Sequence, residues 1–425
     1  MSTNTTAAVP TRGAAAATRL IVASSVGNAL EFYEILVYGY FAVTISKVFF
    51  PTADEAVSIL VTLGTFGISF LARPVGAIFL GAYGDRKGRK QALTLSILLM
   101  TIGTGLMTLM PSYGSIGLLA PILVIAARLL QGFSVGGEFA SSTAFLVEHR
   151  PDRAGFFASW QWSSQGLAAL VATGFGVLLT TSMSADTLQA WGWRIPFAFG
   201  LLIGPVGYYI RNQLSETPEF IQSGEASTPL RDLFVGQWDR LLLTIGAVAA
   251  STSSQYILVY MPTYAIRELN LPQSIGFTAA VSAAALQTLV VPFVGIWVDK
   301  VGQTRLMIGA AILFMLTAYP AFVVVGAHPS LAVLIAMVCW FSLLKSFFSG
   351  ALPSLMAKIF PVKTRVTGMS LSYNVSVPIF GGFAPFFAQS LIGLTGSKLA
   401  PSYYMIATAS LSLAALLVLR RRYRM

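Results

Sequence analysis

The segment GAYGDRKGRK at residues 81–90 decides the fold, because a second copy, GIWVDKVGQTR, occurs at residues 295–305. In both copies a glycine is followed four residues later by an aspartate and then a base, and another glycine lies three residues after the aspartate. The two aspartates, Asp85 and Asp299, are 214 residues apart, about half of the 425-residue chain. A repeat of this length predicts two related halves.

The composition predicts a polytopic membrane protein. Hydrophobic residues make up 55% of the chain, charged residues only 10%, and the mean hydropathy is +0.73. A soluble domain carries roughly 25% charged residues, so this chain has too few to build a water-facing surface. The composition therefore excludes a soluble enzyme, a coiled coil and a disordered protein.

Twelve segments are long and apolar enough to cross a bilayer, which requires about 20 residues. They are residues 19–48, 55–82, 90–110, 116–148, 153–181, 191–211, 239–266, 273–299, 303–325, 329–360, 363–394 and 400–422. Six segments separate the two copies of the repeat, so the copies have the same orientation. We expect an all-α polytopic membrane protein with twelve transmembrane helices in two parallel six-helix repeats.

The expected organisation follows from these segments. It comprises a disordered N-terminus (1–18), a six-helix half (19–211), a polar linker (212–238), a second six-helix half (239–422) and a short tail (423–425). Of the 27 basic residues, twenty lie in loops on one side, and four, Lys47, Arg194, Arg267 and Lys398, lie on the other. Because the positive side faces the cytoplasm, we expect both termini there. This distribution explains the net charge of +11 without a nucleic-acid partner.

Six ordered stretches give the chain a resemblance to a known family. They are GNALEFYE (27–34), FLARPVGAIFLGAYGDRKGRK (70–90), RLLQGFSVGGE (128–138), WGWRIPF (191–197), LSETPEF (214–220) and FGGFAP (380–385). The chain resembles the major facilitator superfamily and, within it, the metabolite–proton symporters. The stretches SWQWSSQ (159–165) and TGSKLAPSYYM (395–405) are most similar to citrate and tricarballylate symporters.

The resemblance implies a proton-coupled symporter of the inner membrane that imports an organic anion by alternating access. Its partners would be the anion, protons and the lipid bilayer, with no cofactor, and we expect a monomer. The family also includes carriers of zwitterions such as proline or betaine, and an aromatic acid is a further alternative cargo.

Charged residues within apolar segments are candidates for the transport site, because a buried charge in a membrane is costly. Glu31 and Glu34 lie three residues apart on one helix face. Two carboxylates this close do not both ionise easily, which suits a proton carrier, although either could be a structural partner of an arginine. The family usually has aspartate where this chain has Glu34.

A second set of polar residues lies in the fourth segment. At about 100° per residue, Gln131 and Glu138 share one face and Arg128 lies about 60° from Gln131. Arg128 suits a substrate carboxylate, whereas Glu138 is a third candidate for the proton; an Arg–Glu pair between helices is the structural alternative. Lys345, near the middle of the tenth segment, is a candidate anion contact. Arg73 is expected to be structural, snorkelling or pairing near the cytoplasmic side.

Uncharged polar residues complete the candidate cavity, although each could simply pack helices together. They are Tyr33, Tyr38, Gln161, Gln165, Gln255, Tyr256, Tyr373 and Asn374, of which Asn374 is favoured. The repeated motif predicts a cytoplasmic gate that includes Asp85, Arg86, Arg89 and Asp299, because acids near a helix start can pair with its dipole.

Two other classes of protein fit the sequence less well. A membrane-embedded enzyme needs a reactive constellation, but Cys339 is the single cysteine and the two histidines, His149 and His328, lie in predicted loops. These residues offer no metal site, and GFSVG (132–136) matches a nucleophile elbow only by chance, since it lies within a helix. A sensor with a transporter fold would be expected to carry an additional soluble domain.

Overall fold

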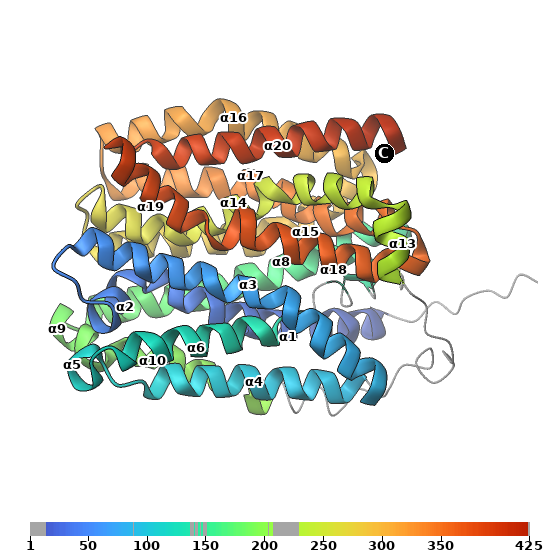
Figure 1. The fold of residues 1–425 in the computed structure, drawn as a ribbon. Helices are drawn as coiled ribbons and strands as arrows, with labels where there is room; N and C mark the ends of the chain where they lie inside the picture. The colour runs from blue at the N-terminus through green and yellow to red at the C-terminus, as the bar shows by residue number, and fades with distance from the viewer. Residues whose placement is uncertain are drawn as a thin grey trace, which may run out of the picture.

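A computed structural model describes residues 14–87, 89–136, 140, 143–144, 146–147, 151–202, 204–206 and 229–423. The described residues form helices joined by short turns and contain no β-strand. The helices lie side by side in a single bundle (Figure 1).

The first half contains the elements up to the linker. They are α1 (Ala14–Tyr40), α2 (Ala42–Phe49), α3 (Glu55–Lys87), α4 (Arg89–Leu109), α5 (Tyr113–Ile116), α6 (Leu119–Ser134), η1 (Pro151–Arg153), α8 (Ala154–Ser182), α9 (Ala185–Thr187), η2 (Leu188–Gly192) and α10 (Arg194–Gly200). The helices α1 and α2 form one bent span, with an angle of 67° between Gly27–Tyr40 and Ala42–Phe49.

The second half begins after the linker. Its elements are α13 (Pro229–Gly236), α14 (Trp238–Arg267), α15 (Gln273–Val301), α16 (Gln303–Ala327), α17 (Leu331–Ile359), η3 (Val362–Thr364), α18 (Arg365–Ser376), η4 (Val377–Gly382), α19 (Ala384–Thr395) and α20 (Ala400–Tyr423). The segment η4 is π-helical and joins α18 and α19 into one span of 34 residues with η3.

Where the structure describes them, the helices follow the expected segments and correct some of their boundaries. Helix α1 begins at Ala14, so residues 14–18 are helical rather than part of a disordered N-terminus. Residues 1–13 and 207–228 lie outside the described residues, and α13 occupies the end of the expected linker. Helix α6 ends at Ser134 and a turn follows at residues 135–136, so the expected continuous helix over 116–148 is interrupted.

The two ends of the bundle differ in charge. One end, here called the basic end, contains the C-terminal ends of α3, α15 and α20, whose last turns carry Lys87, Lys300 and Arg420. Helix α13 and the C-terminus also lie there, on the right of Figure 1. The opposite end, here called the far end, contains α2, α5 and α9 on the left of the same view. This distribution agrees with the loop charges in the sequence.

Helices α8 and α15 pack closely along their whole length and bring the two halves together. Glycines make this possible, because an added Cβ at Gly155 would lie 2.7 Å from the Gly295 carbonyl oxygen. A Cβ at Gly176, near the far end, would lie 2.0 Å from the Phe277 ring. We call this contact the α8–α15 seam.

A second close contact joins α3 and α6 within the first half. A Cβ at Gly132 would lie 1.7 Å from the Ser69 carbonyl oxygen, and one at Gly76 would lie 1.8 Å from the Phe133 carbonyl oxygen. The absence of side chains at these positions lets the two backbones touch, as small residues do in membrane helix pairs. This packing places Ser69 of α3 beside Arg128 of α6.

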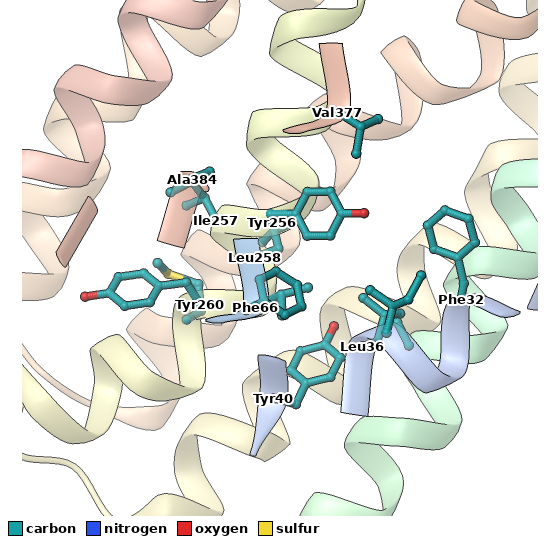
Figure 2. Packing of buried hydrophobic residues seen from close by; sticks show 14 of the residues in the cluster. Phe32, Leu36, Tyr40, Phe66, Tyr256, Ile257, Leu258, Tyr260, Val377 and Ala384 are labelled. Carbon is teal, nitrogen blue, oxygen red and sulfur yellow. The ribbon is translucent and has the colours of Figure 1, made fainter. Parts of the chain in front are cut away.

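Aromatic residues from both halves fill the centre of the bundle. Tyr256 of α14 packs edge-on against Phe66 and Phe70 of α3, with ring centroids 5.7 and 5.0 Å apart. Figure 2 shows Tyr256 and Phe66 in this cluster, with Leu36 and Tyr40 of α1 nearby. By contrast, Ile78, Phe293 and Leu316 are at least two-thirds exposed, which suits contact with lipid.

Candidate functional site

Glu34 of α1 is buried in the first half, and its two carboxylate oxygens have different surroundings. The oxygen Oε2 accepts a short hydrogen bond from the Thr104 hydroxyl of α4 and a longer one, at 3.4 Å, from Gln131 Nε2. The oxygen Oε1 has no hydrogen-bond partner among the described residues. It lies instead against Gly200 of α10, where an added Cβ would approach it to 2.0 Å.

Gln131 connects this carboxylate to Arg128. Its side-chain oxygen accepts a hydrogen bond of 2.9 Å from Arg128 Nη1, and its Nε2 also donates to Thr104 Oγ1 at 3.1 Å. Arg128 donates from Nη2 to Ser69 Oγ at 3.1 Å, and its guanidinium lies 4.5 Å from the centroid of the Tyr38 ring. We call these connected groups the Arg128–Gln131–Glu34 chain.

This chain can respond to both a proton and an anion. Arg128 and Glu34 are joined through a neutral amide, and no direct ion pair between them is found among the described residues. Protonation of the carboxylate removes a negative charge that faces the guanidinium. Because Coulomb interactions are strong where water is excluded, Arg128 then attracts an anion more strongly.

Lys345 of α17 is the buried cation of the second half. Its side chain is 0% exposed, and its Nζ donates a hydrogen bond of 2.6 Å to Gln287 Oε1 of α15. The ammonium nitrogen also lies 5.8 Å from the centroid of the Trp162 ring of α8. No described carboxylate lies within ion-pair distance of it.

Arg73 of α3 differs from its expected environment. It is only 2% exposed, so it does not snorkel to the surface. Its guanidinium lies 4.4 Å from the centroid of the Phe70 ring and 5.9 Å from that of Phe32. The Tyr256 ring of the second half lies 5.0 Å from the same Phe70 ring, between their centroids. Arg73 is therefore a second buried cation in the first half, which the sequence interpretation placed too near the helix end.

Not all the expected polar residues converge on this site. Tyr38 lies under Arg128, but the Tyr33 hydroxyl donates to the Pro196 carbonyl of α10, at 2.8 Å, and remains within the first half. Asn374 of α18 donates to the Gly136 carbonyl at 2.7 Å, near the basic end, and so joins the two halves. Gln161 and Gln165 are buried on α8, and Glu31 is buried one turn before Glu34.

Two groups of expected residues lie outside the described part of the structure in whole or in part. Glu138 is one, so its predicted alignment with Gln131 stays a prediction. The side chains of Asp85, Arg86 and Arg89 are likewise outside it. The remaining gate candidate, Asp299, is described below.

Asp299 accepts two backbone hydrogen bonds across the α8–α15 seam. The donors are the N–H groups of Gly155, at 2.7 Å, and Phe156, at 3.0 Å, in the first turn of α8. The N-cap residue of α8, Arg153, makes no side-chain cap of its own. The aspartate of one half thus caps a helix of the other half at the basic end.

The cavity found beside Gln287 in the described part of the bundle is small. A small cavity of about 10 Å³ lies between α1, α8, α14, α15 and α17, and its lining includes Tyr40, Gln255, Gln287 and Ser342. This is room for about one water molecule, not for a metabolite. At the far end, Arg267 of α14 makes an ion pair with Glu55 of α3, which is a further contact between the halves.

Several contributing residues were not singled out from the sequence. Nothing in the sequence distinguishes Thr104, Ser69 and Gly200 as site residues, because threonine, serine and glycine are common in membrane helices. Gln287 can be recognised from the sequence, since it is the single side-chain amide in the apolar run 275–298. It also lies 214 residues after Arg73, the spacing of the repeated motif. Among the described residues, no three His, Cys, Asp or Glu side chains are grouped as metal ligands.

Known proteins resemble the chain over nearly all of its length. Residues 32–371 match the Major Facilitator Superfamily. A citrate-proton symporter of Klebsiella pneumoniae is 36% identical, over 93% of this chain and 90% of its own. A proline/betaine transporter of Escherichia coli is 33% identical, over 93% of this chain and 82% of its own.

Solved structures of the same fold are also similar. The proton:xylose symporter XylE superposes with a TM-score of 0.76, at 15% identity, over 96% of both chains. Such low identity supports the fold alone, which is the expected one. Among the described residues eight helices, or nine if α1 and α2 count as one span, are long and apolar enough to cross a membrane, which is consistent with twelve helices in two six-helix repeats. The relatives are named as transporters, so the expectation of a transporter rather than an enzyme is confirmed. The chain is a multi-pass membrane protein that belongs to the major facilitator superfamily.

Proposed function

We propose that the protein is a proton-coupled symporter that imports an organic anion, a di- or tricarboxylate such as citrate. The Arg128–Gln131–Glu34 chain carries this proposal, because it connects a buried carboxylate to a buried guanidinium through one amide. Glu34 would take the proton and Arg128 a substrate carboxylate. Glu31 and Glu138 are further candidates for the proton.

Protonation of Glu34 and binding of the anion at Arg128 would be coupled through charge. When Glu34 is ionised, its charge offsets that of Arg128, and anion binding is weak. When Glu34 is protonated, the unbalanced guanidinium favours an anion. Linkage requires that the anion in turn favours protonation, so both would cross the membrane together.

Lys345 favours an anion over a zwitterion as the cargo. A buried ammonium with no carboxylate partner among the described residues is best satisfied by a negatively charged ligand. Two buried cations, Arg128 and Lys345, would suit a solute with two or more carboxylates. The relatives named as proline/betaine transporters support the alternative of a zwitterionic cargo, and an aromatic acid is a further alternative.

The gates and the orientation are part of the same proposal. Asp299 and the Asp85 motif would close the basic end, which we place in the cytoplasm with both termini, at the inner membrane. The two six-helix halves would rock about the centre, with residues 212–238 as the link between them.

Uptake into liposomes tests the proposal. We expect the purified protein to accumulate labelled citrate when an inward proton gradient is imposed, and not without it. Glu34→Gln should abolish accumulation in response to the gradient while citrate exchange continues. Asp186→Asn, an exposed carboxylate change at the far end, should leave accumulation unchanged.

The same assay separates the alternatives. A panel of succinate, tricarballylate, benzoate, proline and betaine would identify the cargo if citrate fails. Accumulation of betaine or proline without any carboxylate would overturn the anion proposal. If Glu34→Gln still accumulated citrate in response to the gradient alone, the role of Glu34 would be wrong, but the symport would stand.

A further inference from the structure

Gln287 connects the two halves of the protein through one buried amide. Its side-chain oxygen accepts from Lys345 Nζ at 2.6 Å, and its Nε2 donates to the Trp162 carbonyl oxygen of α8 at 3.1 Å. Gln287 and Lys345 belong to the second half and Trp162 to the first. The amide therefore makes the hydrogen bond of Lys345 and a contact of the α8–α15 seam at the same time.

The Lys345 ammonium is only partly satisfied by this amide. It has three N–H donors, and Gln287 is its one hydrogen-bond partner within the described part of the chain. An amide oxygen is a weaker partner for a buried ammonium than a carboxylate oxygen. A hydrogen bond between two ionised groups is stronger than one in which only the donor is charged. A carboxylate that reached Lys345 would compete well with Gln287.

The surroundings of Gln287 contain polar groups that could line a carboxylate site once the two halves move apart. The small central cavity is lined by Gln287, Gln255, Ser342 and Tyr40. Gln255 is 3% exposed, and its side-chain oxygen has no hydrogen-bond partner among the described residues. Separation of α8 from α15 would widen this space beside Lys345.

We propose that, in the empty carrier, the Gln287 side chain occupies the position beside Lys345 Nζ where a substrate carboxylate binds. The substrate carboxylate then displaces the Gln287 side chain. This inference deepens the proposed function and rests on it. Displacement leaves Gln287 without the partner of its oxygen and so weakens its link to Trp162. Recognition of the anion is thereby transmitted to the seam that must open for transport, and Gln287 acts as a positioning residue that tunes specificity.

Substitutions at Gln287 have opposite expected effects. Gln287→Glu places a tethered carboxylate on Lys345, and it should raise the KM for citrate about tenfold or more, because substrate must displace a charged competitor. Gln287→Leu removes the competitor and the link to Trp162. It should lower the KM about threefold and slow net uptake more than exchange, since the empty closed state loses a contact.

A matched control exists in the same helix bundle. Gln303 accepts a hydrogen bond from Lys358 at 3.2 Å, near the basic end and far from the central cavity. Gln303→Glu therefore makes the same chemical change beside a different lysine. It should leave the KM within about twofold of the unmodified protein.

The outcomes distinguish this inference from the proposed function. The measurements are the citrate KM and maximal rates of proton-driven uptake and exchange, with thermal unfolding to verify that each variant folds. If the unmodified protein transports carboxylates and Gln287→Glu leaves the KM within about twofold, only this inference is overturned. If Gln287→Glu does not fold, Gln287→Leu provides the test. A raised KM in Gln287→Leu would overturn the inference that Gln287 competes with the substrate for Lys345. If the unmodified protein takes up no carboxylate, both are overturned.

Discussion

Gly200 and Glu34 fit together as a pair: a Cβ at position 200 would lie 2.0 Å from the Glu34 oxygen Oε1. That oxygen has no hydrogen-bond partner among the described residues, whereas Oε2 is held by Thr104 and Gln131. The missing side chain of Gly200 therefore creates the space in which one carboxylate oxygen lies. Position 200 sets how long an acidic side chain α1 can carry at residue 34.

Gly200→Ala should displace the Glu34 carboxylate from Gln131 and reduce proton-driven uptake about tenfold or more, equivalent to about 1.4 kcal/mol. Shortening the acid by one methylene makes room again, so Glu34→Asp in the Gly200→Ala background should restore much of the loss. Uptake rates across a range of external pH would test this pair. Similar losses in the single and double variants would show that the contact is not what limits transport.

Arg128→Lys should raise the KM for the anion about tenfold with less effect on the maximal rate. The guanidinium reaches Gln131 and Ser69 with two different nitrogens, and a single ammonium cannot reproduce that geometry. Arg240→Lys is a suitable control, because Arg240 donates to the Ile359 carbonyl near the basic end. An equal change in KM for the two substitutions would argue against a special role for the Arg128 guanidinium.

Uptake of the anion should increase as the external pH falls. The sign follows from the proposed coupling, since protonation of Glu34 removes the charge that offsets Arg128. In Glu34→Gln the carboxylate is replaced by a permanently neutral amide, so the affinity for the anion should depend much less on pH. Binding of citrate to the detergent-purified protein at several pH values measures this directly. A pH dependence that survives in Glu34→Gln would assign the proton to another acid.

Asp299→Ala should loosen the α8–α15 seam at the basic end. It removes the acceptor for the Gly155 and Phe156 N–H groups, and a lost helix cap costs about 1 kcal/mol. In a protein with Cys339→Ser, a cysteine at the buried position Ser159 should react about fivefold faster with maleimide when Asp299 is replaced. Equal maleimide labelling rates at position 159 with and without Asp299 would show that Asp299 does not help to close the basic end.

The Arg267–Glu55 ion pair should contribute to closure of the far end. Both side chains are partly exposed, so we expect a modest effect of about twofold to fivefold on uptake when either is neutralised. Reversal of both charges, with Glu55→Arg and Arg267→Glu, should restore the contact. Uptake by the single and double variants forms a complete cycle. A double variant no better than the singles would show that the pair does not act as a unit.

The fold could be predicted from the sequence because its signals are long and redundant. The repeat around Asp85 and Asp299 fixes the relation of the halves, and each apolar segment is long enough to be recognised alone. The interruption after Ser134 was not predicted, since GFSVGG contains no proline and reads as a continuous apolar helix. The expected alignment of Glu138 with Gln131 assumes a continuous helix across that point, and Glu138 lies outside the described residues.

The candidate site could be predicted only in part. Glu34, Gln131 and Arg128 stand out as polar groups in apolar helices, and the structure joins them through hydrogen bonds. Thr104 could not be recognised, because a threonine in a helix commonly bonds its own backbone, as Thr108 does to the Thr104 carbonyl. Tyr33 was placed in the cavity, but one residue is a rotation of about 100°, which is enough to direct it to Pro196 instead.

The small volume of the cavity beside Gln287 has a consequence for any measured affinity. A cavity of about 10 Å³ cannot admit a carboxylate until the two halves move apart, so only the open fraction of molecules is competent to bind. The observed dissociation constant is then the intrinsic constant divided by that fraction. Substitutions along α8 and α15 that touch no ligand, such as those that crowd Gly155 or Gly176, would change apparent affinity by changing populations alone.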